Sequence, residues 1–404
     1  MMGTRPLSTR PLFAALAATA VSVGCLGGLA AVPAQAKKPA PPPPTTTTTV
    51  LPTYPTSVVG VSPQALAKPT SSGKTIRSLT MDNGKFYVGH GDYLNNSGPT
   101  KVSTFDPVTR TFAESGLTAP TEEITTFRKI NGKLYAPWTD PTGSATANQG
   151  FSTNASGTWT NEFKAPAEHV YDVASLTGSD LWMVGSAKNV VGTKGGAAAY
   201  RSTNGGASWS LVAADTSVTE MGRERYYWAA ALNGKMYLQA HGVNEGAPLR
   251  VFNGSSWSTV PGMTPCNTVE SRSVEVYNGR ILCTKFGVGI VAFDGAKATT
   301  VLPMTEWNVL DFDVPGDGYI YALSRSGVYR SADGLSWKGL TTVPEFAWSI
   351  GVYNGTIYLG ERLNATIRKV DGLDLAAAAT TTTGTTTGTT TGVTVCRGKS
   401  GKAC

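Results

Sequence analysis

A short motif, Asn-Gly followed by apolar or aromatic residues, recurs along most of this chain. Close copies begin at Asn83, Asn131, Asn233, Asn278 and Asn354, and two looser copies centre on Gly178 and Gly318. Asn-Gly between apolar, β-branched or aromatic runs is typical of a two-residue hairpin turn, because both central residues of that turn need positive φ. Each copy therefore predicts one β-hairpin.

The spacing of these hairpins indicates the architecture. The turn glycines lie at positions 84, 132, 178, 234, 279, 318 and 355, so the steps between them are 48, 46, 56, 45, 39 and 37 residues. This period is typical of propeller blades. A second strand pair with a tight polar turn follows each hairpin, as in residues 202–209 and 331–337. The sequence therefore predicts an all-β fold, a seven-bladed β-propeller of four-stranded antiparallel blades with disordered N- and C-terminal tails.

The two ends of the chain have a different composition from the repeats. Residues 1–36 have the basic start, apolar run and small-residue cleavage site of a secretory signal peptide, and residues 37–56 form a Pro/Thr-rich linker. The propeller is expected over residues 57–375, followed by a Thr/Gly-rich low-complexity tail over 376–404. Lipidation at Cys25 and retention of the signal as an anchor are alternatives; cleavage leaves no membrane span.

The ring is expected to close through its N-terminus. Residues 58–61 form a strand-like run before the first complete repeat, and the last repeat, residues 347–375, is one strand short. If the last blade takes its outer strand from the N-terminus, no open sheet edge remains there. We also expect a monomer.

Charge and cysteine usage limit the possible partners. Seven of the 34 basic residues and none of the 27 acidic residues lie outside the expected propeller. The propeller therefore has 27 of each, and a basic nucleic-acid groove is not supported. Neither a metal site nor a cofactor is expected, since the chain has no C-x-x-C and its three histidines fall in different repeats. In an exported chain the four cysteines outside the signal suggest disulfides; proximity favours Cys266–Cys283 and Cys396–Cys404 among three possible pairings.

One segment resembles a known family of propellers. Residues 202–209, Ser-Thr-Asn-Gly-Gly-Ala-Ser-Trp, fit the Asp-box pattern S-x-D/N-x-G-x-S/T-W, and residues 331–337 and 152–159 are altered copies. The chain thus resembles the Asp-box (BNR-repeat) seven-bladed propellers of the sialidase-like superfamily. Sialidases of that family use three arginines, a Tyr–Glu pair and an acid; Arg77 faintly matches the first arginine segment, and Arg225, Arg272 and Arg362 lack confirming neighbours. The resemblance therefore favours a propeller that is not a sialidase.

A set of acidic residues precedes the expected inner strands. Glutamates lie 9 to 12 residues before the turn glycine in six repeats, namely Glu123, Glu168, Glu224, Glu270, Glu306 and Glu345. The start of an inner strand lies at one mouth of a propeller channel, so these carboxylates would make that mouth negative. Together with Arg77, Trp228 and Trp348 they form our candidate ligand site. The alternative is that each glutamate pairs within its own loop or with a neighbouring blade.

Three functions fit this sequence. The first is a secreted or cell-surface, non-catalytic propeller that binds a carbohydrate or an extracellular protein on its channel face. The second is a secreted glycan-cleaving enzyme, a sialidase-like glycoside hydrolase, for which the sequence identifies no catalytic residues. The third is a surface adhesion or assembly scaffold. A common fold does not decide among these functions.

Overall fold

The Asn-Gly turns have the left-handed backbone that the sequence predicts. In the computed structural model the five asparagines have φ between 45° and 50°, and the glycines that follow them have φ between 69° and 77°. Each turn joins the first two strands of a sheet, as between Tyr277 and Arg280. The repeated motif therefore does form repeated hairpins.

The structure describes residues 50–142, 148–191, 194–216, 218–219, 222–223, 225–241, 248–260, 266, 271–304 and 309–380. The described residues belong to one unit. Within them, no helix has the length and apolar character needed to cross a membrane.

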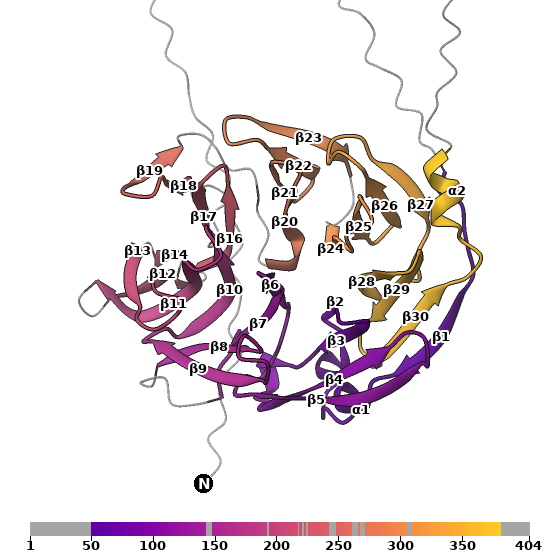
Figure 1. The fold of residues 1–404 in the computed structure, drawn as a ribbon, viewed down its shortest axis with the longest axis horizontal. Helices are drawn as coiled ribbons and strands as arrows, with labels where there is room; N and C mark the ends of the chain where they lie inside the picture. Colours follow the sequence, from indigo (N-terminus) through magenta and orange to yellow (C-terminus); the bar gives the residue numbers. More distant parts are fainter. Residues whose placement is uncertain are drawn as a thin grey trace, which may run out of the picture. The chain divides into compact units, whose positions relative to one another are not determined.

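Seven antiparallel sheets of four strands surround a central channel, which confirms the predicted propeller (Figure 1). Blade 1 consists of β2 to β5: Ser78–Asp82, Lys85–Gly89, Thr100–Asp106 and Thr111–Ala119. Blade 2 consists of β6 to β9: Arg128–Ile130, Lys133–Pro137, Gln149–Thr153 and Thr160–Ala165. Blade 3 consists of β10 to β13: His169–Ser175, Leu181–Val191, Lys194–Ser202 and Ser210–Asp215. Blade 4 consists of β16 to β19: Arg225–Leu232, Lys235–His241, Leu249–Phe252 and Trp257–Val260.

The remaining blades repeat this order, with the first strand innermost. Blade 5 consists of β20 to β23: Val274–Tyr277, Arg280–Lys285, Gly289–Phe293 and Ala298–Pro303. Blade 6 consists of β24 to β27: Val309–Asp313, Ile320–Ser324, Val328–Ser331 and Lys338–Thr341. Blade 7 consists of β28 to β30 and β1: Ala347–Tyr353, Thr356–Glu361, Thr366–Val370 and Thr56–Val61. Outside the blades lie a ribbon and short helical turns: β14 (Val218–Thr219), β15 (Gly222–Arg223), α1 (Pro63–Leu66), η1 (Ser72–Lys74), η2 (Tyr93–Asn95), η3 (Ser271–Ser273) and α2 (Leu375–Thr380).

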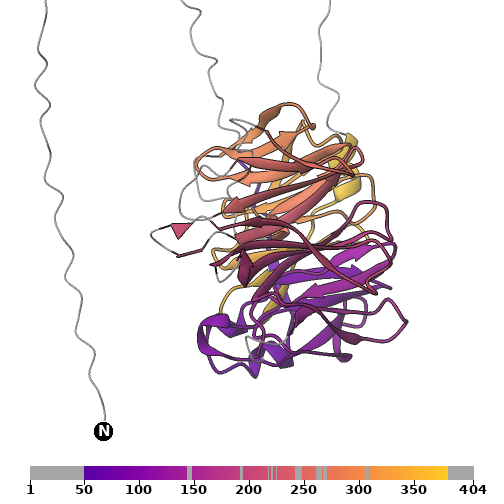
Figure 2. The same cartoon turned by 90° about the vertical axis from the view of Figure 1, so that its left-hand side faces the viewer.

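The hydrophobic core lies between the blades. The described buried residues form seven clusters, and each cluster joins two neighbouring blades. In β11, Leu181 and Met183 pack toward blade 2. Trp182 and Val184, which alternate with them, pack toward blade 4. Because successive side chains of a strand point to opposite faces, one strand contributes to two cores. Figure 2 shows the stack of blades from the side.

The outer turns at residues 202–209 and 331–337 are fixed by side-chain hydrogen bonds. In the turn after β12, the amide of Gly206 donates to Ser202 Oγ (2.8 Å) and that of Ser208 to Asn204 Oδ1 (2.9 Å). The ring of Trp209 lies 6.0 Å from that of Phe151 in the preceding blade. The turn in blade 6 has the same pattern. Such bonds replace backbone pairs that a tight turn cannot make.

The disulfide between Cys266 and Cys283 is confirmed. Both cysteines are buried in the core between blades 4 and 5. The bridge therefore ties the segment after β19 to β21. Cys396 and Cys404 lie outside the described residues, as do residues 1–49 with the expected signal and most of the linker.

The last blade is closed by the N-terminal strand, as the sequence predicts. Strand β1 pairs antiparallel with β30 at the rim of the ring (Figure 1). Val59 is buried in the core between blades 7 and 1, and a Cβ at Gly60 would lie 2.7 Å from the ring of Phe112 in blade 1. Just before β1, the Pro52 carbonyl accepts from the Thr342 amide beyond β27 (2.9 Å). The N-terminal segment thus joins three successive blades.

We expect removal of this segment to open the ring. A chain that starts at residue 62 should melt roughly 5–10 °C below one that starts at residue 50, because β30 loses its partner and Val59 leaves the core. The exposed edge of β30 should also promote association. Differential scanning calorimetry and light scattering measure both effects. Equal melting temperatures for the two chains would contradict a stabilising role for the closure.

Candidate functional site

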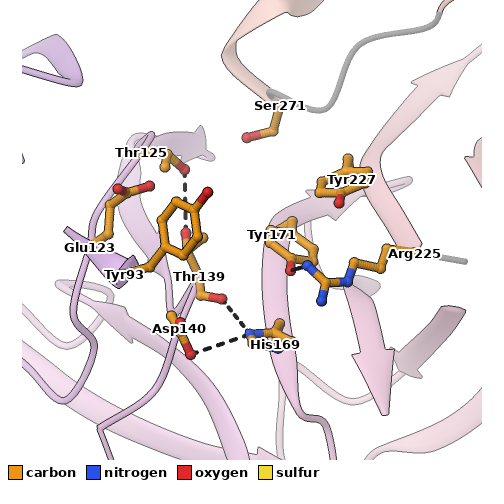
Figure 3. A pocket seen from close by; sticks show the side chains of 10 residues that line it. All are labelled: Tyr93, Glu123, Thr125, Thr139, Asp140, His169, Tyr171, Arg225, Tyr227 and Ser271. Carbon is orange, nitrogen blue, oxygen red and sulfur yellow. Dashed lines mark hydrogen bonds and ion pairs between the residues drawn. The ribbon is translucent and has the colours of Figure 1, made fainter. Parts of the chain in front are cut away.

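A pocket of about 260 Å3 opens at the end of the channel where the inner strands begin. Its lining comes from five blades: Tyr93, Glu123, Thr125, Thr139, Asp140, His169, Tyr171, Arg225, Tyr227 and Ser271. Figure 3 shows these side chains around one space, with Glu123 and Thr125 on one wall and Tyr227 and Arg225 on the opposite wall. The residues meet because an inner strand starts, and its partner strand ends, at the same end of each blade.

One wall of the pocket is a group of stacked rings. The ring centroids of Tyr171 and Tyr227 are 4.6 Å apart, and the imidazole of His169 stacks on Tyr171 at 5.7 Å. Arg225 Nη1 donates a 2.7 Å hydrogen bond to the Tyr171 hydroxyl. Burial raises the pKa of Tyr171 well above its usual value. The buried phenol of Tyr171 therefore stays protonated. Tyr93, which is 47% exposed, supplies a further aromatic ring to the lining.

A second wall is polar. His169 Nδ1 lies 2.9 Å from the Thr139 carbonyl oxygen and 3.6 Å from Asp140 Oδ1. A carbonyl can only accept, so Nδ1 carries the proton of this hydrogen bond, and in the neutral ring Nε2 is an acceptor. Burial and the charge of Arg225 lower the pKa of His169, while burial raises that of Asp140. The pocket therefore contains an uncharged imidazole beside a carboxyl group that is easier to protonate than usual.

A buried carboxyl group lies next to the pocket without lining it. Glu122 is 5% exposed, and its Oε2 has no hydrogen-bond partner among the described residues. Burial and the negative charges of Asp140 and Asp92 raise the pKa of Glu122 to about 7, while Lys68 opposes the shift. This carboxyl group is therefore only partly ionised at neutral pH.

The predicted glutamates do not share one environment. Glu123 is buried and pairs with Arg77 of blade 1 at 2.8 Å, which is the inter-blade pairing given as an alternative. Glu168 is half-buried and acts electrostatically on Asp140, while Glu345 is exposed. Glu224, Glu270 and Glu306 lie outside the described residues. Of the described three, only Glu123 lines the pocket, and a common acidic ring stays a prediction.

The two predicted tryptophans lie apart from the pocket. Trp228 is 1% exposed and packs in the core between blades 4 and 5. Trp348 is half-buried, and the guanidinium groups of Arg272 and Arg362 lie 5.2 and 5.1 Å from its ring centroid. The arginines considered for a sialidase triad are thus used separately: Arg77 binds Glu123, Arg225 binds Tyr171, and the other two contact Trp348.

Below the pocket, the side chain of Arg128 crosses the channel. Arg128 of β6 pairs with Asp172 of the next blade at 2.7 Å and with Glu275 of blade 5 at 3.2 Å. It also donates to the Ser271 carbonyl oxygen at 2.7 Å. Blades 2 and 5 are not neighbours, so this contact spans the channel. A buried guanidinium needs such partners, because an unpaired buried charge is costly.

Sequence reasoning missed most residues of this pocket. Asp140 follows the second strand of blade 2, and Tyr93 lies in the loop after the second strand of blade 1. Antiparallel pairing places the end of a second strand beside the start of the first, so the loops after second strands were a usable signal. The sequence indicates no role for His169, because the three histidines fall in different repeats. Among the described residues, no group of His, Cys, Asp or Glu forms a candidate metal site.

Comparisons with known proteins support the fold. No protein-family model and no curated protein matches the chain. A catalytically inactive virginiamycin B lyase from Staphylococcus aureus, solved with quinupristin, has a TM-score of 0.50 and 9% identity over 78% of this chain and 98% of that chain. YCF48 bound to a D1 peptide has a TM-score of 0.46 and 13% identity over 81% and 99% of the two chains. YCF48 from Cyanidioschyzon merolae has a TM-score of 0.47 and 13% identity over 78% and 98%. At these identities the likeness concerns the fold alone.

Replacement of Glu122 should reveal its raised pKa. Folding raises this pKa from its ordinary value of 4.5 to about 7, so the folded state keeps a proton that the unfolded state loses. Stability therefore falls as pH rises between these values and is lowest above them. Glu122→Gln should melt about 3 °C above the parent at about pH 8 and match it at about pH 4. Exposed Glu114→Gln is the control; a pH-independent difference for Glu122→Gln would contradict the shift.

Proposed function

We propose that this protein is a secreted, non-catalytic β-propeller that binds a saccharide in the pocket at the start of its inner strands. The observation that carries the proposal is the combination of tyrosine rings with convergent polar groups in one pocket of about 260 Å3. Ligand pockets combine apolar surface with a few placed polar groups. Aromatic rings can contact the C–H faces of a sugar, and polar groups of both kinds can bind its hydroxyls.

The polar groups of the pocket suit hydroxyl ligands. A hydroxyl group both donates and accepts, so it needs acceptors and donors together. Asp140 and the unprotonated nitrogen of His169 supply acceptors, and Arg225 supplies N–H donors. Ser271 also lines the pocket, and its buried Oγ has no hydrogen-bond partner among the described residues. A bound sugar hydroxyl would satisfy that group.

Export is part of this proposal. It is supported by the signal-like composition of residues 1–36 and by the disulfide between Cys266 and Cys283, since disulfides persist mainly in oxidising compartments. An extracellular protein is the other partner that the sequence allows. The pocket favours the saccharide, because its lining combines stacked tyrosine rings with several convergent polar groups.

Tyr93 of the pocket lining offers a direct test of binding. A glycan and cell-wall polymer array on the propeller should identify a saccharide, and Tyr93→Ala should weaken its binding about tenfold through loss of a stacking contact. Tyr329→Ala on blade 6, which does not line the pocket, should leave the affinity unchanged. Calorimetric titration of the array hits measures both variants. A silent array, or equal weakening by both changes, would refute the proposal.

Two carboxyl groups favour a glycoside hydrolase as the second candidate. Glu123 and Asp140 both line the pocket; Arg77 pairs with the first, and burial raises the pKa of the second. Different environments for two carboxyl groups are what general acid–base cleavage of a glycosidic bond requires. In this mechanism Asp140 would protonate the leaving oxygen and Glu123 would act as base or nucleophile.

An isosteric change separates the two candidates. If the pocket cleaves glycans, Asp140→Asn should lower kcat at least about a hundredfold and leave saccharide binding within a few-fold. Product release from the array hits, followed by chromatography, measures turnover. Glu162→Gln on the outer strand of blade 2 is the matched control. Absence of turnover in the parent protein, with binding intact, would leave the non-catalytic function standing.

A further inference from the structure

A loop of blade 1 carries Tyr93 to the saccharide pocket. This segment, residues 90–99, joins β3 to β4 and contains the short turn η2; we call it the Tyr93 loop. Tyr93 lines the pocket although its side chain is 47% exposed, and Leu94 beside it is 68% exposed (Figure 3). The rings and chains at the tip of the loop are therefore not held by an apolar core. Polar contacts at the base of the loop have to set the position of Tyr93.

Asp92 fixes the Tyr93 loop from within. Its side chain is fully buried, and Oδ1 accepts a hydrogen bond from the Leu94 amide at 3.1 Å. Oδ2 accepts from Asn95 Nδ2 at 2.6 Å and from the Thr70 hydroxyl. The first amides of a helical turn have no backbone partner, so an aspartate at this position stabilises the turn. Loss of the carboxylate would leave three donors without their acceptor.

The Tyr93 loop also rests directly on the segment that enters blade 2. The Glu122 carbonyl oxygen accepts from the Asp92 amide at 3.0 Å and from Ser97 Oγ at 3.3 Å. A Cβ at Gly91 would lie 2.2 Å from the same oxygen, so the two backbones are in close contact. The Ser97 carbonyl oxygen accepts from Lys68 Nζ. Lys68 and the backbone of Glu122 therefore hold the loop from opposite partners.

The charges at this contact are not balanced. Lys68 is the cation that acts on Glu122, whereas Asp92 and Asp140 both act on it as anions. Glu122 is buried, and its Oε2 has no hydrogen-bond partner among the described residues. A buried carboxylate without a hydrogen bond is costly, and a protonated carboxyl group is much less so. The closed loop therefore fits the protonated form of Glu122, which agrees with the direction of its pKa shift.

The other titratable groups nearby do not supply a counter-charge for Glu122. Arg77 is paired with Glu123 at 2.8 Å. His90 begins the loop, and burial lowers its pKa to about 4, so its ring is uncharged at neutral pH. Burial also lowers the pKa of His169. Between pH 6 and pH 8, ionisation of Glu122 is thus the change in charge that bears directly on the base of the Tyr93 loop.

We propose that Lys68, Asp92 and Glu122 form a latch that holds the Tyr93 loop at the pocket and loosens when Glu122 ionises, so that the saccharide binds most tightly below neutral pH. The proposal rests on the saccharide-binding function proposed above and extends it to regulation. When Glu122 loses its proton, opening of the loop admits water to the carboxylate. Lys68 Nζ can then exchange the Ser97 carbonyl oxygen for this charged partner, which favours the open loop.

Hydrogen exchange of the whole chain, read by mass spectrometry, tests the latch without a ligand. After correction for intrinsic rates, exchange of the Asp92 and Leu94 amides should be about tenfold faster at pH 8 than at pH 6, because the closed loop keeps a proton on Glu122 up to about pH 7 and the open loop does not. Glu122→Gln should remove this dependence and keep the loop closed. Exposed Glu114→Gln is the matched control and should behave as the parent does.

Calorimetric titration with a saccharide from the array tests the regulation. Between pH 6 and pH 8 the affinity should fall several-fold more in the parent than in Glu122→Gln. Asp92→Ala should weaken binding no more than Tyr93→Ala does. Added to Tyr93→Ala, it should have little further effect, because Asp92 acts through the position of Tyr93 and the two changes remove the same contact.

Each outcome decides the proposal. Equal loop exchange at the two pH values, or the same pH dependence in Glu122→Gln, would overturn the latch whether or not a saccharide binds. A pH-dependent loop with an unchanged difference in affinity would overturn its role in binding. A pH-dependent loop with a silent array would support the latch and refute the function of the pocket instead. If Asp92→Ala fails to fold, the isosteric Glu122→Gln decides alone.

Discussion

The structure depends on one constraint: each blade is a thin sheet with two apolar faces, and neither face can be covered by the blade itself. In β21, Ile281 and Cys283 pack toward blade 4, whereas Leu282 between them packs toward blade 6. Every sheet therefore needs a neighbour on both sides, and only a closed ring supplies one to all of them. Strand β1 completes this ring, since without it blade 7 would have three strands and an open edge.

At the centre of the ring, the groups that need partners are polar rather than apolar. The inner strands present edge amides to the channel, and aspartates of the preceding blade accept from them, as Asp172 does from Ala229 at 3.1 Å. Arg128 then neutralises Asp172 and reaches across to Glu275. Removal of water from these charges is costly unless they are paired, so the network is dense on one side of the channel. Asp311 and Asp313 accept from the amides of Ile350 and Val352 in the next blade in the same way.

Much of the fold could be predicted because its signals are local. Asn-Gly requires positive φ at both positions, the repeat period sets the blade, and nearness in sequence favoured the Cys266–Cys283 bridge. The candidate site was harder to predict from the sequence. Similar spacing from a turn glycine placed Glu123 and Glu345 at corresponding positions, yet the first is buried against Arg77 and the second is exposed. Loop length and the neighbouring blade decide such environments, and neither is encoded in the repeat itself.

By itself the sequence determined the hairpins, the number of blades and the strand that closes the ring, because each follows from backbone preference and period within a few residues. Only the tertiary structure decided the pocket. Tyr93, Asp140, His169 and Arg225 belong to four different blades, and they meet because antiparallel pairing brings strand starts and loop ends to one mouth. The physical reason is that the packing of side chains between blades sets the positions of the blades, and this packing is a property of pairs of sheets rather than of any segment of the chain.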